Sequence, residues 1–206
     1  SSPHQPFHSS FGHLTFIPSL ADQIEDGGVL GRCWIVNAHD NHNHQDMIVK
    51  ISSNFQNLQQ EHHNLIHLNS SSSSSLVINV YDDVLELGEG RYGIVLEKGG
   101  VDMENYLKSN YSHLSEIHKL SLAHSLLTIV RSIHQSNMVW VDCKLSNVVR
   151  FHFSLPEWRG IDFEHSLEVG EEIPAHHGCT VLYAPPRVGE VVYGSSNEER
   201  RLVSSK

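Results

Sequence analysis

The chain has 206 residues, is 39% hydrophobic and carries a formal net charge of −10 with histidine neutral. This length suits one large domain or two small lobes with a real core, and no apolar run approaches the roughly 18 residues of a membrane span. The acidic balance argues against a nucleic-acid partner, because such binding needs clustered Lys and Arg.

The first half of the chain has the pattern of an antiparallel sheet with one helix. Residues 1–13, rich in Ser, His and Pro, are expected to form a loose lead-in. Short apolar runs with β-branched residues predict strands, and a stretch of helical spacing predicts a helix among them. We expect five strands with the helix after the third, which is a sheet lobe and not a βαβ series. Four of these strands are the runs 33–36, 47–51, 76–81 and 92–96, and the helix is 55–68 with Asn54 as a possible N-cap.

Two segments of biased composition interrupt these elements. The tract His39–His44 could in principle bind a metal, but a polar hairpin loop is the better interpretation, because such tracts are signals of composition only. The six-serine run Ser70–Ser75 suits a flexible loop.

Helical spacing dominates after the glycine pair Gly99-Gly100. It predicts a short and a longer helix, followed by two small strands. The sequence therefore predicts two lobes joined near residue 98, covering 1–98 and 99–206. The helices are expected at 103–107 and 120–133, and the strands at 148–149 and 160–161.

The most informative motif is Asp-x-Lys-x-x-Asn between apolar flanks, at Asp142, Lys144 and Asn147. These side chains converge only if a tight loop bends them to one side. Together they offer a carboxylate to orient a hydroxyl, a cation to neutralise a transferring phosphate, and an amide oxygen to hold Mg²⁺. The motif resembles the catalytic loop of the protein-kinase superfamily. That resemblance implies an α+β, two-lobed protein-kinase-like fold, with an antiparallel five-stranded N-lobe and a partial, mainly helical C-lobe.

Two further residues extend the resemblance in the first lobe. Lys50 ends an apolar strand, like the Lys of V-A-I-K, and Glu61 lies on the helix that follows. The resemblance implies that Lys50 binds the α- and β-phosphates of ATP and pairs with Glu61. The separation of 11 residues is short for the family, so we expect an abbreviated helix.

Other ATP-binding positions follow from the resemblance. Gly28 and Gly31 match the third and sixth positions of G-x-G-x-x-G, with Asp at the first, although a plain hairpin turn fits about as well. Leu96 would be the gatekeeper behind the adenine, and the Glu97 carbonyl and Gly99 N–H would bind the adenine edge. An ordinary linker is the alternative for this segment.

The second lobe supplies the remaining family-like motifs. Asp162, in Gly-Ile-Asp-Phe-Glu, follows Asp142 by 20 residues and resembles the Asp of D-F-G. The resemblance implies that Asp162 is the principal Mg²⁺ ligand, together with Asn147. The segment 178–186 resembles the substrate loop that ends in A-P-E, which implies a protein substrate.

Several positions depart from the family. Trp140 and Val141 stand in place of the His and Arg of H-R-D, and without that Arg an activation-loop phosphate loses its usual partner. Glu164 replaces the Gly of D-F-G, which costs backbone freedom. Ile48 replaces a small residue over the adenine, and Pro186 replaces the Glu of A-P-E.

The sequence as a whole favours an ATP- and Mg²⁺-dependent protein kinase of the serine/threonine type. A pseudokinase that binds nucleotide or scaffolds a partner is the alternative, and a small-molecule kinase is disfavoured by the substrate loop. The cysteines form no disulfide or zinc pattern, so we expect an intracellular, cytoplasmic protein. Position 1 is Ser, and we expect the chain to be a fragment that stops before the larger lobe is complete.

Overall fold

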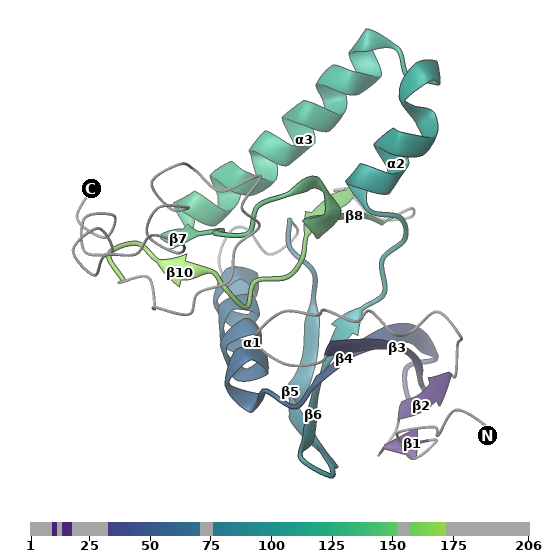
Figure 1. Ribbon diagram of the computed structural model, residues 1–206, viewed down its shortest axis with the longest axis vertical. Coiled ribbons are helices and arrows are strands. Elements are labelled where there is room, and N and C mark those ends of the chain that lie inside the picture. The colour runs from purple at the N-terminus through teal and green to yellow at the C-terminus, as the bar shows by residue number, and fades with distance from the viewer. Residues whose placement is uncertain (1–9, 12–13, 18–32, 71–75, 152–156, 172–206) are drawn as a thin grey trace, which may run out of the picture. The chain divides into compact units, whose positions relative to one another are not determined.

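The computed structural model describes residues 10–11, 14–17, 33–70, 76–151 and 157–171 (Figure 1). These residues form two compact units. The first comprises the described residues up to His62 together with Asn79–Lys98, and the second comprises His63–Ile78 and the residues from Gly99 onward. The segment 63–78, which the sequence placed in the first lobe, therefore belongs to the second unit.

The first unit is an antiparallel sheet with the order β1-β2-β3-β4-β6-β5. The α+β class and the five-stranded antiparallel sheet expected from the sequence are present as β2–β6, and β1 adds a two-residue strand at the edge. Strand β1 lies within residues 1–13, which were expected to form a loose lead-in. That prediction was therefore wrong for Ser10–Phe11. The strands are β1 (Ser10–Phe11), β2 (Leu14–Ile17), β3 (Cys33–Asp40), β4 (Gln45–Ser52), β5 (Val80–Gly88) and β6 (Arg91–Glu97).

The histidine-rich tract is the turn of the β3–β4 hairpin. Asp40 and Gln45 are the last paired residues. The Asp40 carboxylate accepts hydrogen bonds from the His42 backbone N–H at 2.8 Å and from Asn43 Nδ2 at 2.6 Å. A side chain that bonds to its own turn in this way fixes the turn locally. The polar hairpin loop expected from the sequence is therefore confirmed.

Strand alternation gives the sheet two covered faces. Met47, Val49 and Ile51 on β4 point into an apolar cluster with Val36 and Val95. The residues between them point to the opposite face, since successive side chains on a strand alternate. That face carries Ile48 and Lys50 on β4, beside their β6 partners Leu96 and Ile94.

Helix α1 (Phe55–Ser70) follows β4 after two residues. Asn54 caps it, because its Oδ1 accepts the Asn57 backbone N–H at 3.2 Å. Leu58, Leu65 and Leu68 are fully buried, as their helical spacing predicts. The helix has 16 residues, so the expectation of an abbreviated helix was wrong. Instead, the connection between β4 and α1 is short.

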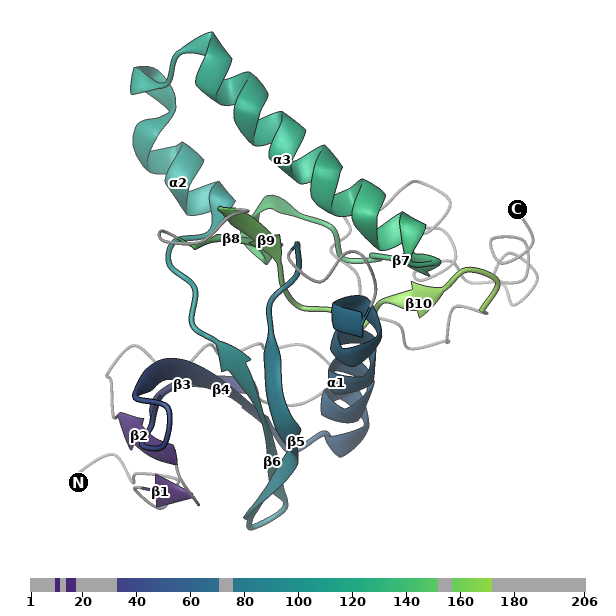
Figure 2. The same ribbon diagram turned by 180° about the vertical axis from the view of Figure 1, so that it is seen from behind.

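The described residues of the second unit include the end of α1, helices α2 and α3, and two small sheets. Figure 2 shows α2 and α3 side by side, with β8 and β9 next to one end of α2. Ser115 caps α3, which therefore begins four residues before the expected start at 120. The elements are α2 (Met103–Asn110), η1 (Tyr111–His113), α3 (Glu116–Gln135), β7 (Met138–Val139), η2 (Leu145–Asn147), β8 (Val148–Arg150), β9 (Trp158–Gly160) and β10 (Leu167–Glu168).

The expected strand 76–81 divides between the two units. Gly160 donates its N–H to the Leu76 carbonyl at 2.9 Å and accepts from the Ile78 N–H at 3.0 Å. The run 76–78 is therefore held by β9, and β5 begins only at Val80. Within the described part of the chain, no helix has both the length and the apolar character needed to cross a membrane.

Candidate functional site

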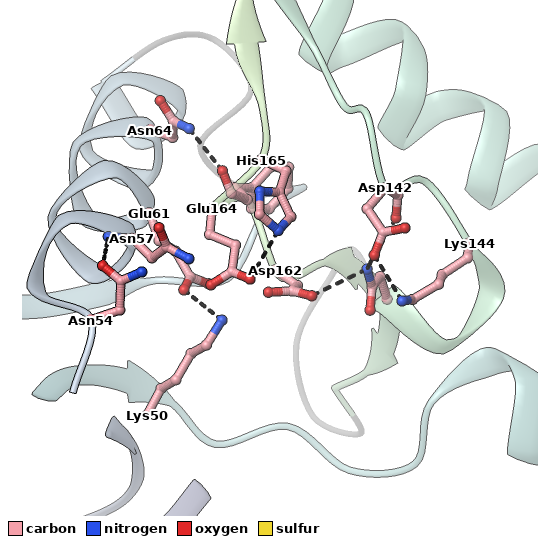
Figure 3. Close-up of polar contacts among 12 residues, drawn as sticks. Lys50, Asn54, Asn57, Glu61, Asn64, Asp142, Lys144, Asp162, Glu164 and His165 are labelled. Carbon is pink, nitrogen blue, oxygen red and sulfur yellow. Dashed lines mark hydrogen bonds and ion pairs between the residues drawn. The ribbon is translucent and has the colours of Figure 1, made fainter. Parts of the chain in front are cut away.

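In the first unit, Lys50 and Glu61 form a buried ion pair. Lys50 Nζ lies 2.7 Å from Glu61 Oε2, and the side chains are 11% and 1% exposed (Figure 3). The pair forms because α1 begins almost directly after β4, which brings its second turn over the end of that strand. The ion pair that the resemblance implied is thus present. Each of these buried charges is stabilised by the other, because burying either charge without its partner costs free energy.

Leu96 and Glu97 end strand β6 on the same sheet. Leu96 is 4% exposed and pairs with Ile48 across the strands. The Glu97 carboxylate accepts a hydrogen bond from Asn79 Nδ2 at 2.8 Å, and the Glu97 backbone N–H donates to the Asn79 carbonyl at 3.0 Å. Asn79 therefore fixes Glu97 at the end of the strand, a role that no sequence pattern indicated.

In the second unit, Asp142, Lys144 and Asn147 converge as their spacing predicts. Lys144 Nζ lies 2.7 Å from Asp142 Oδ2. Asn147 Nδ2 donates to the Asp142 carbonyl at 3.0 Å and to Asp142 Oδ2 at 3.3 Å. The turn of η2 that bends the loop is closed by the Asn147 N–H on the Lys144 carbonyl at 3.0 Å. Asp142 and Asn147 are both buried.

Asp162 joins this cluster. Its Oδ2 lies 3.5 Å from Asn147 Nδ2, and the Ile161 N–H donates to the Asn147 carbonyl at 2.9 Å. Asn147 Nδ2 faces both Asp142 and Asp162, and Asn147 Oδ1 is the atom of this amide that could bind a cation. One amide oxygen and a carboxylate are the oxygen ligands that Mg²⁺ takes in proteins. The donor set at Asn147 and Asp162 therefore fits this ion.

The Asp162 loop is backed by aromatic packing. Trp140 stacks on Phe163 with ring centroids 5.2 Å apart and planes 25° apart, and Phe163 is fully buried. Trp140, which stands where the motif has His, therefore packs against Phe163. Gly160 permits this approach, because a Cβ there would lie 3.0 Å from Phe163 Cζ and 3.3 Å from Trp140 Cη2.

His165 and Glu164 form a contact in the same unit that is an ion pair when His165 is protonated. His165 Nε2 lies 3.2 Å from Glu164 Oε1. Burial lowers the pKa of His165, but the hydrogen bond to Glu164 and the charges of Glu164, Asp162 and Asp142 outweigh it, so that the pKa is raised. Glu164, which departs from the family's Gly, thus has a defined partner. The importance of His165 was missed because the pairing depends on how the loop turns.

Cys143 lies in the loop between Asp142 and Lys144 and lacks the character of a reactive thiol. Burial, with a smaller contribution from the Asp142 charge, raises the pKa of its thiol from 9.0 to about 11. A thiol with so high a pKa is a poor nucleophile at neutral pH.

Gly99 has a packing role. A Cβ on Gly99 would overlap Val149 Cγ1, so only glycine fits against β8 here. The positions expected to cover phosphates, Gly28 and Gly31, lie outside the described residues, as does the substrate-type loop 178–186.

Comparisons with known proteins give no family for the chain. No family model matches the sequence, and no curated protein matches it closely enough to indicate a relative.

Proposed function

We propose that this protein is a protein kinase of the serine/threonine type, with a two-lobed kinase-like fold, that transfers the γ-phosphoryl group of ATP to a hydroxyl of a protein substrate. The main support is the cluster of Asp142, Lys144, Asn147 and Asp162, whose polar atoms lie within 3.5 Å of their neighbours. A buried acid beside a cation, next to an oxygen pair suited to Mg²⁺, matches the needs of phosphoryl transfer.

Each residue has a defined task in this proposal. Asp142 orients the substrate hydroxyl and accepts its proton. Lys144, 2.7 Å from Asp142, supplies positive charge beside the transferring group. Lys50 binds phosphate oxygens and is held by its ion pair with Glu61. Bound Mg-ATP supplies the phosphoryl group and the divalent charge that neutralises it, and Asn147 and Asp162 are the residues that would hold the metal.

A pseudokinase is the second candidate, and two observations favour it. Glu164 occupies the place of the glycine in D-F-G and contacts His165. The substitution places a second carboxylate next to Asp162 in the sequence region of this motif. Ile48 packs beside Leu96 on the face of the sheet that carries Lys50. Both features bear on nucleotide binding, and the two candidates differ in whether phosphate is transferred.

The test is Asp142→Asn, with Asp102→Asn as its matched control. Both exchanges replace a carboxylate by an amide of the same size, and Asn at 102 can still cap α2, as Asp102 does through the Asn105 N–H. We expect Asp142→Asn to lower the rate of phosphate transfer from radiolabelled ATP to protein by about a hundredfold or more, the usual scale for a general base. The control should keep its rate.

Three results separate the candidates. Unchanged turnover in Asp142→Asn would remove the catalytic assignment. Mg²⁺-dependent ATP binding by calorimetry without any transfer in the wild type would favour the pseudokinase. No Mg²⁺-dependent binding of ATP at millimolar concentration would contradict the assigned nucleotide site and favour a pseudokinase that scaffolds a partner.

A further inference from the structure

Asn64 makes contacts that the proposed roles leave unexplained. It lies on α1 within the second unit and is 3% exposed. Its Nδ2 donates to the Phe163 carbonyl at 2.7 Å and to the Ser166 carbonyl at 2.9 Å. A carboxamide nitrogen carries two N–H bonds, so both are used on the loop that follows Asp162. Figure 3 shows Asn64 directed at this segment.

The two carbonyls are the ends of one turn. The Ser166 N–H donates to the Phe163 carbonyl at 3.0 Å, which closes the turn over residues 163–166. The Phe163 carbonyl therefore accepts twice, once from the turn itself and once from Asn64. Neither carbonyl needs solvent, and the turn is fixed to a helix as a unit.

The backbone conformation of Asp162 explains why the following turn needs to be held in place. Its φ is +63°, in the left-handed region that non-glycine residues rarely adopt, although Asp tolerates it better than most. A conformation of this kind persists when its surroundings hold it. On one side, the Ile161 N–H is bonded to the Asn147 carbonyl at 2.9 Å. On the other, Asn64 holds the turn that begins at Phe163.

We propose that Asn64 is a positioning residue for the metal ligand Asp162. By fixing the turn that follows, it keeps the Asp162 carboxylate beside Asn147, so that a divalent cation binds without reordering the loop. The role in cation binding rests on the proposed function, whereas the clamp on the loop can be tested in the protein without any ligand.

A purely structural role makes a different prediction. A residue that only fills and satisfies the core would, when replaced, lower stability and weaken all ligand binding together. A positioning residue affects the loop and the Mg²⁺ dependence, while nucleotide binding without metal is kept. The experiment therefore needs a measurement on the loop and one on the metal.

The informative variants are Asn64→Asp and Asn64→Leu. Asp keeps the shape and loses both N–H donors, and Leu keeps similar volume without polar atoms. Asn69→Asp is the control, because Asn69 on the same helix makes one amide-to-carbonyl bond, to Ile78 at 3.1 Å, and none to the turn. Hydrogen–deuterium exchange of the ligand-free proteins, followed by peptide mass spectrometry over 161–168, measures the clamp. Calorimetric titration of Mg²⁺ at fixed ATP measures the positioning.

We expect exchange over 161–168 to be about tenfold faster in both Asn64 variants, the order for losing one to two buried hydrogen bonds, and unchanged in the control. The Mg²⁺ concentration for half-saturation should rise about tenfold, the same order, with metal-free ATP binding unchanged.

Unchanged exchange in the Asn64 variants overturns the clamp. Faster exchange with unaltered Mg²⁺ dependence overturns the positioning role. If the wild type binds no Mg-ATP, the proposed function fails and the role at the metal with it, while faster exchange still supports the clamp. If neither variant folds, the wild type decides, because an unprotected Ser166 amide would contradict the fixed turn.

Discussion

Removing the Lys50 ammonium should destabilise the fold strongly, because it leaves the Glu61 carboxylate buried without its charge partner. Glu61 is 1% exposed and the pair is 2.7 Å apart. Breaking such a pair by removing one partner costs about 3–5 kcal/mol, and the 11% exposure of Lys50 places Lys50→Met near the lower end. Replacing both partners, as in Lys50→Met with Glu61→Leu, removes the unpaired charge and should return stability to within about 1 kcal/mol of the wild type.

Urea denaturation followed by circular dichroism measures these free energies of unfolding. Lys108→Met is the matched control, since Lys108 pairs with Glu104 on the surface of α2 at 2.7 Å with 67% of its side chain exposed. A pair of that kind contributes about 0.3–0.5 kcal/mol. A cost for Lys50→Met no larger than for Lys108→Met would refute the reasoning. So would a double variant less stable than Lys50→Met. If Lys50 binds ATP as proposed, the double variant should regain stability without regaining ATP binding.

Two further predictions concern titratable groups. Because the folded protein raises the pKa of His165 above its ordinary 6.5, protonated His165 stabilises the fold at low pH, and this contribution is lost as pH rises through the folded pKa. His165→Gln should therefore lower the free energy of unfolding at pH 6, with a deficit that shrinks toward pH 9 in urea titrations; an equal deficit at both pH values would contradict the pairing. The Cys143 pKa of about 11, against 9.0 for an ordinary thiol, leaves roughly a hundredfold less thiolate at pH 8, so iodoacetamide should label it about a hundredfold more slowly in native than in unfolded protein. Peptide mass spectrometry checks this, and equal rates would show that the thiol is exposed.

Local patterns predicted most of the regular structure. The apolar run 47–51 predicted strand β4, and the polar tract His39–His44 predicted the turn before it. The misplaced strand at 76–81 shows the limit. Its first residues are apolar like a strand but bond to Gly160, far away in the sequence. Similarly, Ser10–Phe11 lacks a strand pattern and is paired only because Leu14–Ile17 lies beside it.

The same distinction between local contacts and contacts far apart in the sequence applies to the candidate site. Asp142, Lys144 and Asn147 lie within six residues, so a single tight turn brings them together and spacing was enough to predict it. Asn64 acts across a long stretch of chain, on carbonyls that carry no sequence signal at all. One hint was available: an Asn beside Leu65 on the buried stripe of α1 must find hydrogen-bond partners inside the protein.

The Trp140–Phe163 stack allows a test of what holds the loop of Asp162. Trp140 is 5% exposed, and its Nε1 has no hydrogen-bond partner among the described residues. A buried donor without a partner costs about 1–3 kcal/mol, which offsets part of what the ring contributes by packing. Trp140→Phe removes the donor and keeps an aromatic ring on Phe163, so its net cost should be below about 1.5 kcal/mol, within the range of tolerated apolar exchanges. Trp140→Ala removes the ring as well and should cost about 3–5 kcal/mol.

Hydrogen–deuterium exchange over 161–168 should be faster in Trp140→Ala than in Trp140→Phe. Phe163 directly follows Asp162, and only Trp140→Ala removes the ring that packs on Phe163. Urea denaturation gives the two free energies, and peptide exchange gives the loop. If Trp140→Phe costs as much as Trp140→Ala, the indole N–H has a partner after all, and its hydrogen bond, not the stacked ring, supports Phe163. A third variant, Trp140→His, introduces the residue of the H-R-D motif. It keeps a flat ring but loses volume and adds a polar edge, so its stability should fall between those of the other two variants.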